Sequence, residues 1–175
     1  MFLLLIASAT VAAQKTLPLK VSNENMSITF RPRSPDQMDS FYGARGFPKA
    51  MRDILKKQCF ITVGIRNTSQ QKIWLNLADW KFSVNGKPIK REHRDQWKQR
   101  WQDMNIPLRY QSTFRWTLIP ETLDYLPGEK EGGNIILPFS KEKITLDASF
   151  ATGDNKQGEV ISIHYDQLQC RENSQ

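Results

Sequence analysis

The sequence predicts a mainly β fold in which two antiparallel sheets pack face to face. About eight or nine short segments alternate apolar and polar residues with a period of two, as strands with one buried face do. Gly, Pro and Asn residues separate these segments, and helices do not alternate regularly with them, which argues against a parallel sheet. Short helical insertions are expected between the strands.

The alternating segments define the expected strands. Segments 61–66 and 73–78 should pair as a hairpin across the polar turn at 67–71. A second tight turn is expected at Asn85-Gly86, because both residue types tolerate positive backbone angles. The expected strands are 26–30, 59–66, 73–78, 81–84, 114–119, 135–139, 144–150 and 161–165.

A helical insert is expected near 35–57. Ser34, Pro35 and Gln37 place a capping hydroxyl, a first-turn proline and an N3 glutamine in the order that a helix start requires. A second helix should follow at about 48–57, where apolar residues recur at helical spacing.

This pattern resembles, at fold level, the immunoglobulin-like antiparallel β-sandwich domains of exported bacterial proteins. The resemblance rests on a strand that ends in Asn67-Thr68-Ser69 and on Leu126-Pro127-Gly128-Glu129 before a later strand. It covers about two thirds of the chain, and it implies a fold without implying an activity.

An export signal is expected at 1–13, an apolar run that ends in small residues. The run is shorter than the roughly 20 residues that span a bilayer, and the mature protein is expected to have no transmembrane segment. Residues 14–175 should then form a single β-sandwich domain in the periplasm, with secretion as the alternative. A buried first strand or helix at 1–13 is the competing interpretation.

Two cysteines, Cys59 and Cys170, are an even number in a chain that is expected to be exported. A structural disulfide between them is the leading interpretation. A reactive thiol lacks support, because the chain has no Cys-x-x-Cys pair.

The net charge of +7 and the pI near 9.5 favour an acidic partner. For an exported protein this predicts another envelope protein or an acidic surface component. Nucleic acid is not an expected partner, since no recognition motif is present.

A basic aromatic helix is expected near 91–104. In it His93, Trp97 and Trp101 are four residues apart and share one face. The tryptophans could anchor an acidic or amphipathic partner, or they could hold the helix on the sandwich as a core face, which is the commoner use of such a stripe. The candidate binding residues are Arg91, His93, Arg94, Trp97, Lys98 and Trp101.

No catalytic, metal-binding or cofactor motif occurs in the sequence, and no cofactor is expected. The sequence therefore predicts an exported, non-enzymatic binding or accessory protein of the cell envelope. The alternative is an exported hydrolase whose site combines His93 and His164 with loop carboxylates. The candidate loop carboxylates are Glu121, Asp124, Glu129 and Glu131.

Overall fold

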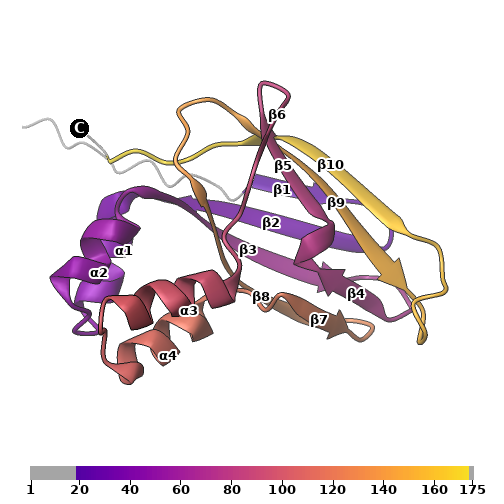
Figure 1. The fold of residues 1–175 in the computed structure, drawn as a ribbon. Coiled ribbons are helices and arrows are strands. Elements are labelled where there is room, and N and C mark those ends of the chain that lie inside the picture. The colour runs from indigo at the N-terminus through magenta and orange to yellow at the C-terminus, as the bar shows by residue number, and fades with distance from the viewer. Residues whose placement is uncertain (1–18, 174–175) are drawn as a thin grey trace, which may run out of the picture.

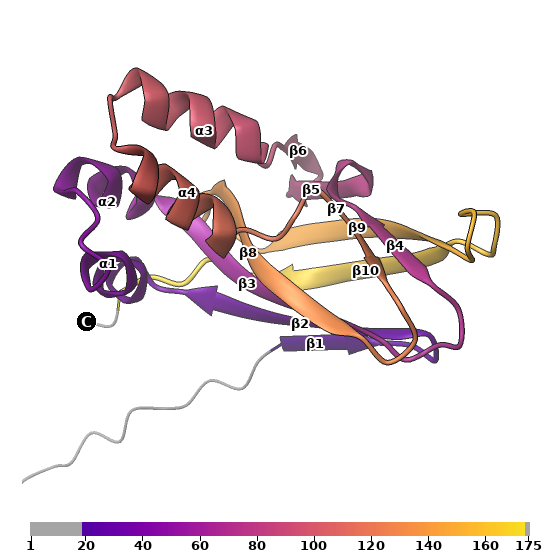
Figure 2. The ribbon, with the colours of Figure 1, turned by 90° about the horizontal axis from the view of Figure 1, so that it is seen from below.

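The computed structural model describes residues 19–173, which form two antiparallel sheets and four α-helices (Figure 1). The predicted export signal at 1–13 lies outside the described residues. Within the described range the fold is mainly β, in agreement with the alternating pattern of the sequence. The helices gather at one end of the sheets in both views (Figures 1 and 2).

The first sheet has the strand order β1-β2-β3-β8, and the second has the order β6-β5-β9-β4-β7 with β10 paired to β9. Every strand pair is antiparallel. The strands of the first sheet are β1 (Leu19–Ser22), β2 (Met26–Arg33), β3 (Gln58–Asn67) and β8 (Lys130–Pro138). Those of the second sheet are β4 (Ile73–Asn76), β5 (Trp80–Val84), β6 (Lys87–Ile89), β7 (Thr122–Tyr125), β9 (Ile144–Thr152) and β10 (Ile161–Leu168).

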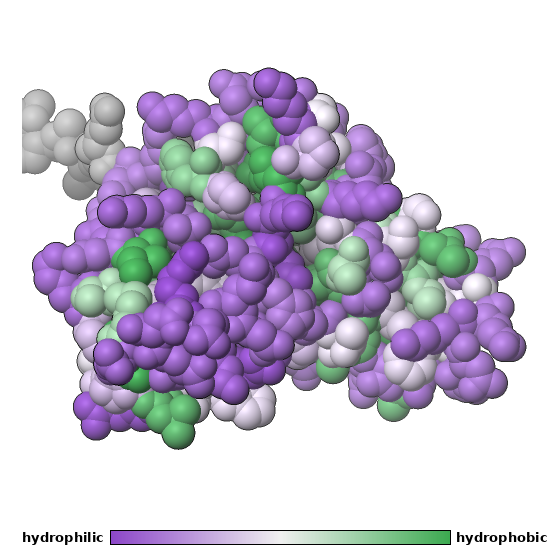
Figure 3. Space-filling model, in the orientation of Figure 1, coloured by the Kyte–Doolittle hydropathy of each residue, from purple (hydrophilic) through white to green (hydrophobic). Residues whose placement is uncertain are grey.

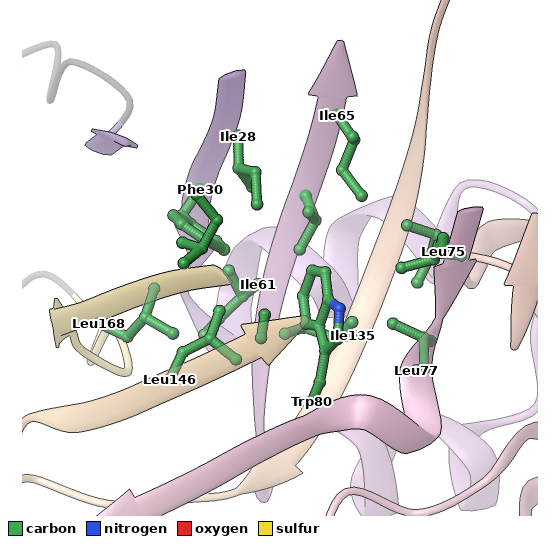
Figure 4. Packing of buried hydrophobic residues seen from close by; sticks show 14 of the residues in the cluster. Ile28, Phe30, Ile61, Ile65, Leu75, Leu77, Trp80, Ile135, Leu146 and Leu168 are labelled. Atoms are coloured by element: carbon green, nitrogen blue, oxygen red, sulfur yellow. The ribbon is translucent and has the colours of Figure 1, made fainter. Parts of the chain in front are cut away.

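A hydrophobic core fills the space between the two sheets (Figure 4). The alternating apolar residues of β2 and β9 are buried, as their period of two predicts. A short 3-10 turn at Leu77–Asp79 connects β4 to β5. The core residues labelled in Figure 4 are Ile28, Phe30, Ile61, Ile65, Leu75, Leu77, Trp80, Ile135, Leu146 and Leu168.

A second core lies on the other face of the first sheet, where Phe60 of β3 and Ile136 of β8 pack against the helices. Strand β3 is therefore covered on both faces, which explains its run of three consecutive buried residues from Cys59 to Ile61. The four helices, called the helical layer below, are α1 (Pro35–Gly43), α2 (Lys49–Leu55), α3 (Arg94–Asp103) and α4 (Leu108–Thr117).

Local signals in the sequence predicted several elements correctly. Ser34 accepts a hydrogen bond from the Gln37 backbone N–H at 3.2 Å, and the Gln37 side chain accepts one from the Ser34 backbone, so the capping box of α1 is confirmed. Asn85 and Gly86 both have positive φ, at 49° and 75°, and they form the tight turn between β5 and β6.

The predicted strand at 114–119 is wrong, because this segment belongs mostly to helix α4. The apolar residues Tyr110, Phe114 and Leu118 recur every four residues and pack in the helical layer. The alternation of Phe114, Trp116 and Leu118 fits a strand equally well in sequence, but Trp116 is 85% exposed.

The predicted hairpin between 61–66 and 73–78 is also wrong. Strand β3 pairs with β2 and β8, whereas β4 pairs with β7 and β9, so the turn carries the chain from one sheet to the other. Buried Asn67 holds this corner, since its Nδ2 donates to the carbonyl oxygens of Gln71 at 2.7 Å and Tyr125 at 2.9 Å.

The disulfide between Cys59 and Cys170 is confirmed. It joins β3 of the first sheet to the segment that follows β10 of the second sheet. A cross-link across 111 residues of sequence reduces the entropy of the unfolded chain, which stabilises a fold of this size by about 4 to 5 kcal/mol in the chain-entropy model.

Candidate functional site

Helices α3 and α4 form an excursion from the second sheet, because the chain leaves at β6 and returns at β7. An ion pair between Arg91 and Glu121 fastens the two ends of this excursion. Both side chains are less than one fifth exposed, and both guanidinium Nη atoms donate to the carboxylate. Glu121 Oε1 also accepts a hydrogen bond from the Arg94 backbone N–H at 2.8 Å. Arg91, a candidate binding residue, therefore has a structural role.

His93 caps the N-terminus of α3. Its Nδ1 accepts a hydrogen bond from the Asp95 backbone N–H at 3.1 Å, and its own backbone N–H donates to Gln96 Oε1 at 2.7 Å. This reciprocal arrangement satisfies donors that a helix start leaves free. The contacts of His93 explain where α3 begins.

Trp97 and Trp101 are buried, with 1% and 0% of their surface exposed. Their rings stack at 5.4 Å between centroids, and both rings also pack against Phe114 of α4. Both rings are part of the core of the helical layer, as the competing interpretation expected, and neither ring is exposed at the surface for a partner to bury. Because the aromatic face turns inward, the surface over α3 is mainly hydrophilic (Figure 3).

Lys98 is exposed and Arg94 is half-buried, and both line a groove of about 370 Å³ between the two helices, called the α3–α4 groove below. Arg115 Nη1 donates to Asp95 Oδ1 at 3.0 Å, and this hydrogen bond lowers the pKa of Asp95. Burial lowers the pKa of Arg94, which still remains a cation near neutral pH. The groove is lined by Arg94, Asp95, Lys98, Trp101, Leu108, Gln111, Ser112, Phe114 and Arg115.

The sequence prediction missed the outward side of α4. Trp116 is the most exposed large apolar residue among residues 19–173, at 85%, and Leu108 follows at 71%. Trp116 lies two positions after buried Phe114, which turns it by about 200° around the helix and away from the core. The four-residue spacing of Tyr110, Phe114 and Leu118 is the signal that could have revealed this. The outer face of α4 is made of Leu108, Arg109, Ser112, Thr113, Arg115 and Trp116.

The two histidines contact different carboxylates. His164 Nδ1 lies 2.6 Å from Asp147 Oδ1 on the neighbouring strand, and this hydrogen bond raises the pKa of His164. His93 Nε2 lies 3.7 Å from Glu121 Oε2, but Glu121 already accepts from Arg91. A second groove, of about 600 Å³, is lined by His93, Glu121 and Asp147 among others.

The other loop carboxylates also have structural contacts. Asp124 lies 3.3 Å from Lys72 Nζ, and Glu129 accepts a hydrogen bond from the Leu126 backbone N–H at 2.7 Å. Across residues 19–173, no group of three or more His, Cys, Asp or Glu side chains is placed to hold a metal ion. The geometry therefore adds no support to the hydrolase alternative.

No protein-family model matches the chain, and no curated protein sequence matches it. In a comparison with solved structures the chain is similar to the crystal structure of a "putative lipoprotein (ycdA) from Bacillus subtilis subsp. subtilis str. 168". The TM-score is 0.44 at 9% identity, and the match covers 85% of this chain and 38% of that chain. A likeness this slight transfers neither a fold family nor a function.

Within residues 19–173, none of the helices has the length and apolar character needed to cross a bilayer.

Proposed function

We propose that the protein is an exported, non-enzymatic accessory protein of the periplasm that binds an acidic, amphipathic segment of another envelope protein. The contact surface is the outer face of α4. A disulfide is typical of proteins that fold outside the reducing cytoplasm, and the apolar run at 1–13 supports export. An immunoglobulin-like arrangement of the two sheets is part of the same proposal.

The exposure of Trp116 is the observation that carries this proposal. A tryptophan with 85% of its surface in water contributes little to folding, because it buries little apolar area. Tryptophan and arginine are the residues most enriched among those that dominate binding energy at protein interfaces. Trp116 shares its helix face with Arg109, which lies about two turns earlier.

The charge of the surface favours an acidic partner. Arg109 and Arg115 belong to the outer face of α4, and Arg94 and Lys98 continue the positive charge into the adjacent groove. Opposite charge on a partner accelerates association and fixes orientation. An apolar side chain of the partner would bury Trp116, while its carboxylates would face the arginines.

Site-specific photo-crosslinking in the native host tests this surface. A photoreactive phenylalanine replaces Trp116 in one variant and Val160 in a control variant. Val160 is also an exposed apolar residue, at 63%, but it lies in the loop between β9 and β10, at the end of the sheets opposite the helices (Figure 1).

We expect position 116 to crosslink one discrete envelope protein through an acidic segment, while position 160 leaves that protein unlinked. Crosslinking of the same protein from both positions, or from neither, would contradict the proposal.

A further inference from the structure

Three polar atoms of residues that line the α3–α4 groove are buried and have no hydrogen-bond partner among the described residues. They are Trp101 Nε1, Gln111 Oε1 and Arg94 Nε. Trp101 itself is 0% exposed. Buried polar groups are nearly always paired, because an unpaired one loses its hydrogen bonds to water without compensation. Of the seven such atoms among residues 19–173, these three belong to residues that line one groove, where a single bound ligand would supply partners for all of them.

The hydrogen bonds already present define what the groove offers. Gln111 Nε2 donates to the Ile106 carbonyl oxygen at 2.7 Å, so the amide of Gln111 leaves its oxygen as an acceptor. Trp101 Nε1 and Arg94 Nε can only donate. The groove therefore combines an acceptor from α4 with donors from α3.

Charge and shape restrict the ligand further. Three cations line the groove, and its one carboxylate, Asp95, is already paired with Arg115. Leu108 and Phe114 add an apolar wall. A volume of about 370 Å³ is at the lower end of the range of small-molecule sites.

We propose that the α3–α4 groove binds the C-terminal residue of a polypeptide, with a free carboxylate and an apolar side chain. The last residue of a chain carries its carboxylate, its amide N–H and its side chain on one Cα atom. These three groups match the donors, the acceptor and the apolar wall of the groove, in that order. The carboxylate accepts from Trp101 and Arg94 beside the charge of Lys98. The amide N–H donates to Gln111 Oε1, and the side chain packs on Leu108.

This inference rests on the proposed function, since it makes the chain end part of the same envelope partner. An internal Asp or Glu carries its carboxylate on a side chain, farther from its own amide N–H, and fits the acceptor less well. A fully ionised phosphate offers no donor to Gln111.

A titration of the full chain with two peptides tests the groove. The probe is N-acetyl-Ala-Ala-Leu with a free carboxylate, and the matched probe is the same peptide with a C-terminal amide. The readout is the indole N–H resonance of Trp101 in ¹H–¹⁵N correlation spectra. We expect this resonance to move with the carboxylate peptide and to stay in place with the amide peptide.

Two variants make the result specific. Lys98→Gln should weaken binding of the carboxylate peptide by at least about fivefold, because it removes a cation from the groove. Lys141→Gln removes an exposed cation outside the groove and should leave the affinity unchanged. No movement of the Trp101 resonance with either peptide, equal movement with both, or equal weakening by the two variants would each overturn the proposal.

The outcome is separable from that of the crosslinking experiment. A negative peptide titration with a positive crosslink at position 116 removes the chain-end proposal and leaves the outer face of α4 as the binding surface. Peptide binding without a crosslink removes Trp116 as a contact with the partner and leaves the groove as the binding site.

Discussion

Helices α3 and α4 both have ten residues, lie side by side, and carry tryptophan and arginine, yet they place their tryptophans oppositely (Figure 2). In α3, Trp97 and Trp101 are four residues apart on the buried face. In α4, Phe114 occupies the buried face and Trp116 points outward. The angular position of an aromatic residue on its helix, rather than the aromatic content of the helix, decides whether its ring packs in the core or lies at the surface.

The largest expected effect comes from Trp101→Ala. We expect it to lower the free energy of unfolding by about 3 to 5 kcal/mol, because it leaves a cavity between Trp97 and Phe114. Urea unfolding followed by circular dichroism measures this. Trp116→Ala is the matched control and should change the same quantity by less than about 0.5 kcal/mol. Equal losses in the two variants would remove the distinction between the helices.

Loss of the Arg91–Glu121 ion pair, which attaches α3 and α4 to the second sheet, should have the next largest effect. Glu121→Gln should lower the free energy of unfolding by about 1 to 3 kcal/mol, because the mostly buried Arg91 side chain loses its ionised partner. Glu142→Gln, at an exposed loop position, is the control for loss of one negative charge. Equal free energies of unfolding for Glu121→Gln and Glu142→Gln would show that the ion pair does not stabilise the attachment of α3 and α4 to the second sheet.

Acrylamide quenching of tryptophan fluorescence should distinguish Trp116 from the buried tryptophans, with a change of moderate size. Trp116→Phe should remove the emission that acrylamide quenches most strongly, because Trp80, Trp97 and Trp101 are shielded from solvent and Trp74 is only partly exposed. Stern–Volmer plots of the wild type and the variant measure this. An unchanged quenching constant would contradict the assignment of Trp116 as the most exposed tryptophan.

The smallest effect is expected away from the helices, at His164. Its hydrogen bond to Asp147 raises the pKa of His164, so Asp147→Asn should lower that pKa in an NMR titration. Because the folded-state pKa is raised, the contribution to stability is present below the unfolded value of about 6.5 and is lost as the pH rises through the folded pKa. The pair is exposed, so we expect little change in unfolding. An unchanged pKa in Asp147→Asn would contradict this contact.

Local patterns made the main features of the fold predictable. The capping box at Ser34, the Asn85-Gly86 turn and the period-two strands each depend on residues that are close in sequence. The disulfide was predictable as well, because the chain offers only Cys59 and Cys170.

Features that depend on distant contacts were not predictable in this way. The turn at 67–71 suits a hairpin or a change of sheet equally well in sequence, and the pairing of β3 and β4 with different strands shows which occurs. The segment 114–118 fits both a strand and a helix. The candidate site was partly predictable: Arg94 and Lys98 line the groove, but the exposure of Trp116 depends on which face of α4 the first sheet covers.

The central claim is that the outer face of α4 binds the envelope protein that the crosslinking experiment identifies. The affinity of that protein, purified without a crosslink, for the Trp116→Ala variant tests this claim most directly. Isothermal titration calorimetry on a variant whose unfolding free energy equals that of the wild type gives this number. We predict an affinity at least about tenfold weaker than that of the wild type, with Val160→Ala unchanged. A Trp116→Ala affinity equal to that of the wild type would contradict the account.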